Sequence, residues 1–442
     1  MISPNDWKQQ AQTHTGQDQS LRWLLQPGTA QAAFRASELP TRKTERWKYT
    51  PVTALLQQDF LSTAAESTVD EEAARACFAQ LPNACRIVLV NGRLHRALSD
   101  FSDLENQGVV TPFSQCNPEQ RDLVNQYLGT TIELQHHLFA ALNYSDLQDG
   151  LLLHAPALQK LAQPVYVVYL GSALNAPAWA QTRLLVVAEP GAELQLIEQF
   201  DSLGDQNNLF HNHITEIVLQ PNARLQHIRL QVEQEALSHI NGLHVKLSRD
   251  SHYEQHGIAF GSQLKRNDIS LQFAGENSSA ELNGVFLSKH RQHIDNHLSL
   301  AHTQPHCTSN TAFKGFVTDE SRAIFNGRIH IHPGAQKTEA HLNNKNLLLS
   351  KKAELDTKPE LEIYADDVKC SHGASIGQLD EKSLFYFRSR GIDKAGAEAM
   401  LCLGFVNEKV EQIPSAPVQA LAQEKLGRFF NDVDKLKALW SL

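Results

Sequence analysis

The chain has 442 residues, of which 41% are hydrophobic and 20% are charged, and its formal net charge at pH 7 is −9. This length allows two or three domains with a sizeable buried core, and the acidic balance argues against a general nucleic-acid-binding protein, which would carry a basic patch. The opening MISPNDWKQQAQ lacks a basic-then-apolar signal region and no apolar run reaches the length of a membrane span, so we expect a cytoplasmic protein without a membrane segment.

Residues 1–150 are predicted to be mainly helical. Apolar residues recur at helical spacing in three segments, 18–40, 71–82 and 120–145. The first of these is interrupted at Pro27. Residues 85–98, CRIVLVNGRLHRAL, differ from them because short apolar runs flank Asn91-Gly92, a pair typical of hairpin turns. We therefore predict a β-hairpin among the helices.

Residues 151–375 have the pattern of a strand solenoid. Short β-branched runs, such as those in RLLVVAEPGAELQLIEQF, alternate with polar turns, and no convincing helix intervenes. The turns recur at an interval of roughly 30 residues, the scale of a structural repeat, near Glu189, Gln220, Arg249, Gly275 and Gln304. Later turns recur at about half that interval, near Asp319, Pro333, Lys351 and Asp366. The lack of helices argues against a doubly wound α/β sheet, and the self-similarity favours a β-helix over a sandwich.

Residues 376–442 are predicted to form amphipathic helices separated by Pro414 and Pro417. The first helix has more apolar residues than one stripe needs, among them Met400, Leu401, Phe405 and Val406. One stripe can pack on the β-helix. The remaining apolar surface needs either the final helix or another protein as its partner, and the sequence leaves both open.

Residues 365–379, ADDVKCSHGASIGQL, contain a GxSxG match centred on Ser375. In the α/β-hydrolases the catalytic histidine follows this serine, but no histidine follows His372 in this chain. The sequence also lacks a GxxxxGK[ST] phosphate loop, a GxGxxG after a strand and an HExxH motif. We therefore expect neither a hydrolase triad nor nucleotide hydrolysis by this chain.

Histidine pairs offer weaker metal-site candidates. His211 and His213, and likewise His330 and His332, share a strand face, but without a third ligand nearby we expect solvated pairs. The tandem His136-His137 is assigned a structural or surface role within a helix. The six cysteines include no CxxC, which argues against a zinc finger or a disulfide scaffold.

Cys370 and His372 form the strongest candidate site. If residues 368–372 are extended, both side chains project from one face, with Ser371 opposite. A thiolate and an imidazole are ligands for iron or zinc, but two ligands do not close a site. The residues alone leave two alternatives open: half of a metal site, or a buried structural cysteine beside a hydrogen-bonded histidine.

Residues 342–392, LNNKNLLLSKKAELDTKPELEIYADDVKCSHGASIGQLDEKSLFYFRSRGI, resemble the signature block of the SufB/SufD family, the scaffold components of the SUF iron–sulfur cluster assembly machinery. The CSHGA segment at 370–374 is most similar to the SufD branch of this family. RWKYTPVTALL, residues 46–56, also resembles the N-terminal region of that branch. The resemblance covers essentially the whole chain.

The resemblance implies a right-handed parallel β-helix with helical regions at both ends. It implies a non-catalytic subunit that pairs with a SufB-like protein and binds a SufC-like ATPase on its C-terminal helices, which would account for the missing phosphate loop. It places a transient iron–sulfur cluster at the SufB interface, with His372 facing a SufB cysteine and Cys370 at the motif position. The resemblance also implies that reduced flavin can associate with the assembled complex, although this chain shows no flavin motif.

The alternative is a stand-alone β-helix enzyme, a polysaccharide lyase or hydrolase. Such an enzyme is expected to carry a secretion signal and to repeat a carboxylate or basic cluster on successive coils. The sequence shows neither feature.

Overall fold

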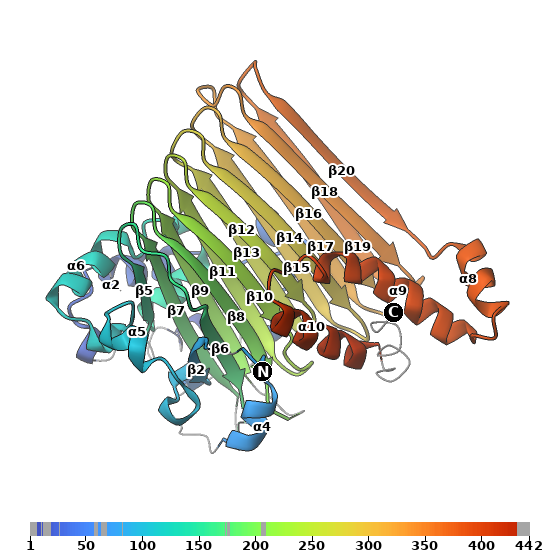
Figure 1. Ribbon diagram of the computed structural model, residues 1–442, viewed down its shortest axis with the longest axis horizontal. Coiled ribbons are helices and arrows are strands. Elements are labelled where there is room, and N and C mark those ends of the chain that lie inside the picture. The colour runs from blue at the N-terminus through green and yellow to red at the C-terminus, as the bar shows by residue number, and fades with distance from the viewer. Residues whose placement is uncertain are drawn as a thin grey trace.

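The computed structural model shows a parallel β-helix with helices at both ends (Figure 1). It describes residues 7–9, 11, 19–25, 27–56, 61–62, 69–81, 83–172, 174, 177–204 and 209–430. Two ten-stranded sheets face each other, and the chain passes from one to the other along most of its length.

Sheet A contains β4 (Val110–Pro112), β5 (Leu151–Ala155), β7 (Ala178–Ala188), β9 (Leu209–Leu219), β11 (Ser238–Leu247), β13 (Leu264–Phe273), β15 (His293–His302), β17 (Arg322–Ile331) and β19 (Glu354–Ile363), with β1 (Leu61–Ser62) paired to β7. Sheet B contains β3 (Arg93–Leu94), β2 (Cys85–Val90), β6 (Val165–Gly171), β8 (Glu193–Ser202), β10 (Arg224–Gln231), β12 (His252–Ala259), β14 (Ser279–Ser288), β16 (Thr308–Val317), β18 (Glu339–Leu348) and β20 (Lys369–Gly377).

From β5 onward in sheet A and from β2 to β20 in sheet B, neighbouring strands pair in parallel, one coil apart. Ser238 of β11 pairs with Leu264 of β13, and Arg322 of β17 pairs with Glu354 of β19. The longer turn interval in the sequence is therefore the length of one coil, and the shorter interval is the half coil from one sheet to the other. This confirms the predicted parallel β-helix.

One corner of successive coils takes the left-handed backbone conformation, at Asn222, Asp250, Asn277, His306 and Lys337, with φ between 57° and 64°. Asn and Asp tolerate this conformation better than other non-glycine residues, because their short side chains can bond locally. The stacked corners also bond to one another, since the Asn277 amide donates to the Asp250 carboxylate at 2.7 Å.

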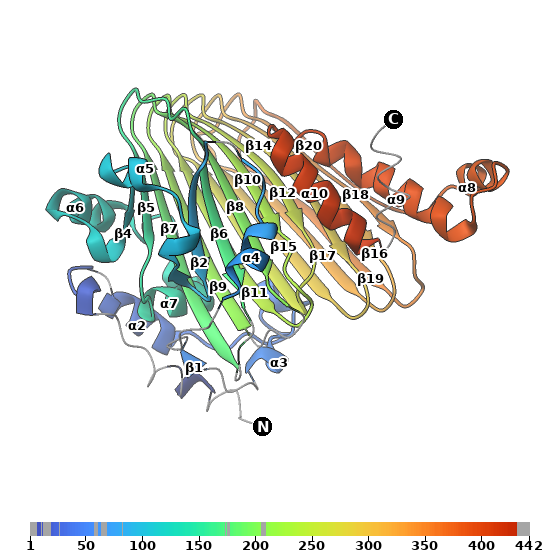
Figure 2. The same cartoon turned by 60° about the horizontal axis from the view of Figure 1, so that its bottom comes forward.

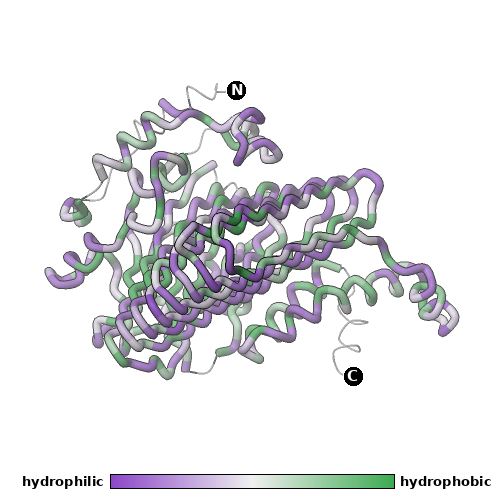
Figure 3. The backbone as a smooth tube through the Cα atoms, turned by 90° about the horizontal axis from the view of Figure 1, so that it is seen from above, coloured by the Kyte–Doolittle hydropathy of each residue, from purple (hydrophilic) through white to green (hydrophobic). Residues whose placement is uncertain are grey.

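Three large hydrophobic clusters connect the described parts of the molecule, and a fourth, small one lies around Ala180, Leu209 and Leu237. One fills the space between the sheets, where strand residues alternate inward and outward. Figure 3 shows hydrophobic and hydrophilic residues interspersed along the coils. A second joins the N-terminal elements to the outer face of sheet A, and a third joins the C-terminal helices and α4 to the outer face of sheet B (Figure 2).

The longest described helices are the last two, α9 with 17 residues and α10 with 14. Among the described residues, the α-helices with given bounds are α2 (Pro27–Ala36), α3 (Thr53–Leu56), α4 (Glu71–Ala76), α5 (Ser102–Asn106), α6 (Pro118–Tyr127), α7 (Leu138–Ser145), α8 (Glu381–Arg388), α9 (Lys394–Val410) and α10 (Ala416–Phe429). Short 3-10 helices are η1 (Gln19–Leu21), η2 (Glu45–Trp47), η3 (Arg96–Leu98), η4 (Phe113–Gln115) and η5 (Leu134–His136). The sequence predicts that the final helix extends to residue 442. Residues 431–442 lie outside the described part of the chain, so the structure does not test this extension.

The N-terminal predictions meet mixed outcomes. The hairpin is confirmed: β2 and β3 are antiparallel, and Asn91 and Gly92 both have positive φ, as a two-residue turn requires. Pro27 begins α2 rather than interrupting a helix, a position where its missing N–H costs nothing.

The single helix predicted over residues 120–145 is two helices, α6 and α7. Gly129, with φ of 79°, lies between them and donates its N–H to the Glu216 carboxylate at 2.9 Å. Thr131 also donates to that carboxylate, at 2.6 Å. Glu216 is itself fully buried against Arg183, so a tertiary contact ends α6 where local spacing alone would continue it.

The interior of the middle coils holds two buried charge clusters. Their members are at most 3% exposed: Glu198, His213, His227, Arg229, Glu233, His239 and Lys265. Each glutamate has a cationic partner, since Arg229 Nε lies 3.2 Å from Glu198 and Lys265 pairs with Glu233. The β-helix core is therefore partly ionic, although its charges are paired.

The expectation that His211 and His213 are a solvated pair was wrong. They are 5% and 0% exposed on β9, and the Thr182 hydroxyl lies 2.8 Å and 2.6 Å from their rings. Burial lowers the pKa of His213 to about 4, so its ring is neutral at pH 7. His330 and His332 do remain partly exposed, with their rings stacked 4.1 Å apart.

Candidate functional site at the open end of the β-helix

The last coil, made by β19 and β20, has partners on one side only. β19 pairs with β17 and β20 pairs with β18, and among the described residues no further strand covers their outer edges. Large apolar side chains are exposed there, with Ile363 at 42%, Tyr364 at 61% and Ile376 at 48%. Unpaired backbone edges beside apolar side chains are the features that recruit another strand.

Cys370 and His372 lie on this last coil. Cys370 pairs with Ala340 of β18, and His372 pairs with Leu342. Ala340 and Leu342 are buried in the interior cluster, so the register places Cys370 and His372 on the inward-facing side of β20. Ser371 projects from the other side, where its hydroxyl lies 2.7 Å from His341 Nδ1.

The two side chains differ in their surroundings. Cys370 is half-buried against the interior cluster, and this burial raises the pKa of its thiol. His372 is exposed, because no coil beyond β20 covers it among the described residues. The thiol is therefore protonated at neutral pH unless a metal or a cation is brought to it, whereas the imidazole is accessible to a partner.

The described residues contain no group of three or more His, Cys, Asp or Glu side chains placed to hold a metal ion. Asp366 and Asp367 are exposed, and Asp367 forms an ion pair with Lys337. Within the described part of the chain, the open end offers at most two soft or borderline ligands, Cys370 and His372. Any metal centre here needs further ligands from outside this set.

The GxSxG segment lies in a strand and not in a strand–turn–helix elbow. Gly373, Ser375 and Gly377 all belong to β20. Ser375 is exposed, and its backbone carbonyl accepts a hydrogen bond from the Asn346 amide at 3.1 Å. This geometry argues against a nucleophilic serine on structural grounds as well.

The apolar residues of α9 have different environments. Val406 is 0% exposed in the cluster that joins α9 to sheet B, and Phe405 is half-buried beneath the Lys314 ammonium, 4.6 Å from its ring. Met400 and Leu401 are only half-buried. The structure thus assigns Val406 to internal packing and leaves part of the Met400 and Leu401 surface accessible.

Helix α8 carries a feature that the sequence analysis missed. It projects beyond the last coil, and Phe385 and Tyr386 on it are 73% and 54% exposed (Figure 1). The signal was present in the sequence as the aromatic run LFYF at residues 384–387. A short helix with exposed aromatic side chains next to a half-covered α9 is a second candidate interaction surface, separate from the strand edges.

No described helix is long and apolar enough to cross a membrane.

Comparison with known proteins gives a family for this architecture. Residues 170–405 match the model of the SUF system FeS cluster assembly SufBD core domain, and residues 15–167 match that of the SufBD protein N-terminal region. The chain belongs to the SufBD family of the SUF system for iron–sulfur cluster assembly. This assignment displaces the alternative of a stand-alone polysaccharide lyase or hydrolase.

Individual relatives agree with the family match over nearly the full length. The chain is 34% identical to the iron–sulfur cluster assembly protein SufD of Escherichia coli, over 88% of each chain. It is 31% identical to an iron–sulfur cluster assembly SufBD family protein of Synechocystis, over 86% of this chain and 85% of the relative. Protein ABCI7, chloroplastic, of Arabidopsis thaliana is 28% identical over 87% of this chain and 81% of the relative.

Proposed function

We propose that the chain is a non-catalytic scaffold subunit of iron–sulfur cluster assembly that works in a complex with a SufB-like protein and a SufC-like ATPase. The observation that carries this proposal is the open last coil, where unpaired strand edges, exposed apolar side chains and the Cys370–His372 pair coincide. Family membership supports the assembly role, and the open coil supports the manner of pairing.

The SufB-like partner docks on the edges of β19 and β20. A strand from the partner would satisfy the free backbone groups of each edge and cover Ile363, Tyr364 and Ile376. Such docking also brings the partner's side chains next to His372.

The nascent cluster is held between the two subunits. His372 acts as an iron ligand, or as a hydrogen-bonding partner of a cysteine thiolate from the SufB-like protein. Cys370 is the second contributor, and its raised pKa means that iron must displace the thiol proton before it can bind. We propose that any reduced flavin binds to the assembled complex, and we assign no residue of this chain to its binding.

The SufC-like ATPase docks on α8 and α9. Phe385 and Tyr386 provide exposed aromatic surface, and Met400 and Leu401 provide half-exposed aliphatic surface on the neighbouring helix. Aromatic side chains with accessible faces are the usual anchors of protein interfaces. Phe405 contributes at the margin, and Val406 acts indirectly by fixing α9 on sheet B.

The test is anaerobic cluster reconstitution on the co-purified three-protein complex. His372→Ala removes a nitrogen ligand from an exposed position, so the complex should assemble while its iron and sulfide content falls sharply. Cys370→Ala should have a smaller effect, because packing accounts for part of its role. Ser375→Ala is the matched control on the same strand and should leave iron and sulfide unchanged. Full iron and sulfide content in the His372→Ala complex would show that His372 does not contribute to the cluster site. This chain would then support its partner only structurally.

A further inference from the structure

A cluster of three lysines lies on the outer face of sheet B beside α9. Lys314 of β16 and Lys345 of β18 are paired in register one coil apart, and Lys409 of α9 is close enough to both for their charges to interact. Lys314 also holds α9 on the sheet, because its Nζ donates to the Phe405 carbonyl at 2.8 Å. We call Lys314, Lys345 and Lys409 the lysine cluster.

The lysine cluster has more ammonium groups than carboxylates. Among the described residues, Glu408 is the one carboxylate that forms an ion pair with it, through Lys314 Nζ at 2.6 Å. Lys409 Nζ donates instead to the neutral side-chain oxygen of Asn283, at 2.8 Å. Burial lowers the pKa of Lys409; Glu408 opposes this effect, and Lys314 and Lys345 add to it. The cluster therefore repels itself, and a further negative charge would stabilise it.

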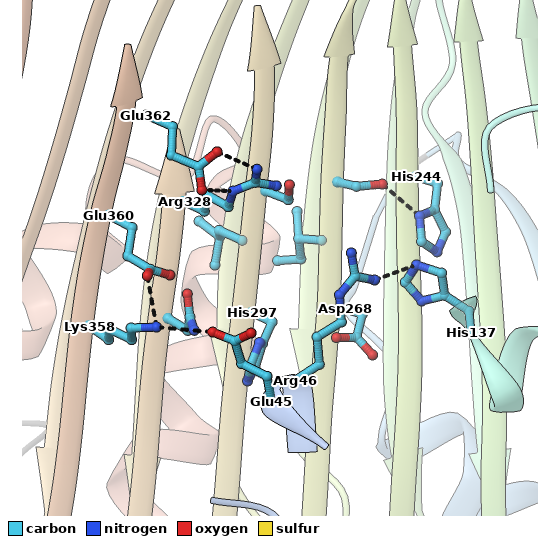
Figure 4. A pocket seen from close by; sticks show the side chains of 15 residues that line it. Glu45, Arg46, His137, His244, Asp268, His297, Arg328, Lys358, Glu360 and Glu362 are labelled. Atoms are coloured by element: carbon cyan, nitrogen blue, oxygen red, sulfur yellow. Dashed lines mark hydrogen bonds and ion pairs between the residues drawn. The ribbon is translucent and has the colours of Figure 1, made fainter. Parts of the chain in front are cut away.

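Lys345 differs in this respect from a comparable cation on sheet A. Arg328 of β17 faces outward and donates two hydrogen bonds to Glu362 of the next coil, as Figure 4 shows. Lys345 forms no ion pair or hydrogen bond with the described residues, and its register partner on the next coil is the uncharged Ser375. The pairing within the sheet that neutralises Arg328 is therefore missing at Lys345.

The lysine cluster adjoins the half-covered face of α9. The helix lies over β14 and β16, and Lys345 on the next strand of the sheet, β18, is exposed (Figure 2). Leu401, Phe405 and Glu408 lie at helical spacing on one face of α9, where the first two are half-buried and the third is exposed. Glu408 in turn lies close enough to Lys345 for their charges to interact. A protein that covers this face of α9 therefore reaches Lys345.

Helix α8, at the other end of this surface, also presents cations. Arg388 and Arg390 are exposed, and neither forms an ion pair with the described residues. The guanidinium carbon of Arg390 lies 3.5 Å from the centre of the Tyr386 ring, which is itself exposed. Arginine and tyrosine are among the side chains that contribute most to protein interfaces. The surface of α8 and α9 thus carries unpaired cations at both ends, on a chain whose net charge is −9.

We propose that the partner that docks on α8 and α9 extends onto sheet B and presents acidic side chains to Lys345 and Lys409. This inference rests on the proposed docking of an ATPase on these helices, and it adds the charge of the contact surface. The acidic side chains supply the counter-charge that the lysine cluster lacks, while apolar contacts to Met400 and Leu401 hold the complex. Charge complementarity of this kind acts mainly by raising the association rate.

Biolayer interferometry with the immobilised SufC-like ATPase and the full-length chain tests the proposal. Lys345→Glu should lower the association rate constant about threefold to tenfold at low ionic strength. The difference should shrink at about 1 M salt, where the Debye length is about 3 Å. Lys345→Arg keeps the charge and should associate at the unmodified rate. An unchanged association rate in Lys345→Glu, or a decrease that salt does not reduce, would overturn the proposal.

Lys246→Glu is the matched control. Lys246 lies on β11 and faces outward from sheet A, and its replacement changes the net charge of the chain by the same amount. An equal decrease in Lys246→Glu would assign the effect to net charge and overturn the proposal. Weaker binding of the SufB-like protein to Lys345→Glu, with ATPase binding unchanged, would overturn it in favour of the other interface.

Two further measurements make the outcome specific. Lys345→Glu places a carboxylate beside Lys314 and Lys409, so its melting temperature should equal or exceed that of the unmodified chain, and a lower value would contradict the charge imbalance. Met400→Glu separates this inference from the proposed function. Loss of the ATPase in Met400→Glu, with unchanged binding in Lys345→Glu, would overturn this inference alone. Unchanged ATPase binding by Met400→Glu would contradict docking on α9, and with it both proposals.

Discussion

Truncating the apolar side chains of the open coil should weaken binding of the SufB-like partner. Ile363, Tyr364 and Ile376 are 42%, 61% and 48% exposed, so a docked partner can bury roughly half of each. Complete burial of a large apolar side chain is worth about 1.5–3 kcal/mol. Scaled by the exposed fractions, the three together contribute about 2–5 kcal/mol, which corresponds to about two to three orders of magnitude in the dissociation constant.

The assay is the dissociation constant of the triple alanine variant for the SufB-like protein, measured by biolayer interferometry beside the unmodified chain. Leu158→Ala is the control, because Leu158 is 81% exposed but follows β5, many coils away from β19 and β20. The control should bind as the unmodified chain does. An unchanged dissociation constant in the folded triple variant, or an equal loss in the control, would refute docking at the open coil.

Three further predictions concern the helical surface and the ionic interior. Met400→Glu should reduce the amount of SufC-like ATPase recovered with the complex and leave the SufB-like protein bound. The subunit ratio after gel filtration measures this, and equal loss of both partners would contradict the prediction. Lys265→Met leaves Glu233 buried without its cation and should lower the free energy of unfolding in urea by about 3–5 kcal/mol. The double variant with Glu233→Gln should recover most of this loss. A double variant no more stable than Lys265→Met would contradict the prediction. Acid should lower the melting temperature between pH 7 and pH 4, and a flat profile would contradict this. Burial lowers the pKa of His213 to about 4, and the pKa of Glu198 is held well below its ordinary value despite burial, by its cationic neighbour and hydrogen-bonded histidines. The unfolded chain therefore takes up protons at these groups at a higher pH than the folded chain does.

The repeating fold could be predicted because local sequence determines the coil length. The interval between turns in the sequence reflects the shift between paired strands, which is 26 residues from Ser238 to Leu264 and 32 residues from Arg322 to Glu354. Alternation along 368–372 correctly put Cys370 and His372 on one face. Each of these inferences depends only on backbone geometry that neighbouring residues set.

The rest depends on contacts between distant residues. Alternation shows that His211 and His213 share a strand face, but it does not say whether that face points into the β-helix or towards solvent. Here the face points inward, where Thr182 and Glu198 provide polar partners. A polar groove on the outer face of sheet A was equally hidden (Figure 4). Its rows of side chains arise from coil shifts that vary from coil to coil, and its wall comes from Glu45 and Arg46, far earlier in the chain than its floor at Asp268.

The two ends of the β-helix are built differently, and this difference bears on how the protein works. At the start of the stack, sheet B ends in the β2–β3 hairpin and sheet A ends in the antiparallel strand β4. At the other end, Leu355 and Leu361 of β19 are inward-facing but only half-buried, and α8 leads away from the coil instead of lying over it (Figure 1). A solenoid whose terminal coil lacks a polar cap needs one from elsewhere. If the proposed SufB-like partner supplies this cap, it will lie beside Cys370 and His372. Under our proposal, the docking event that covers the last coil would then also bring the further ligands that a cluster site here needs.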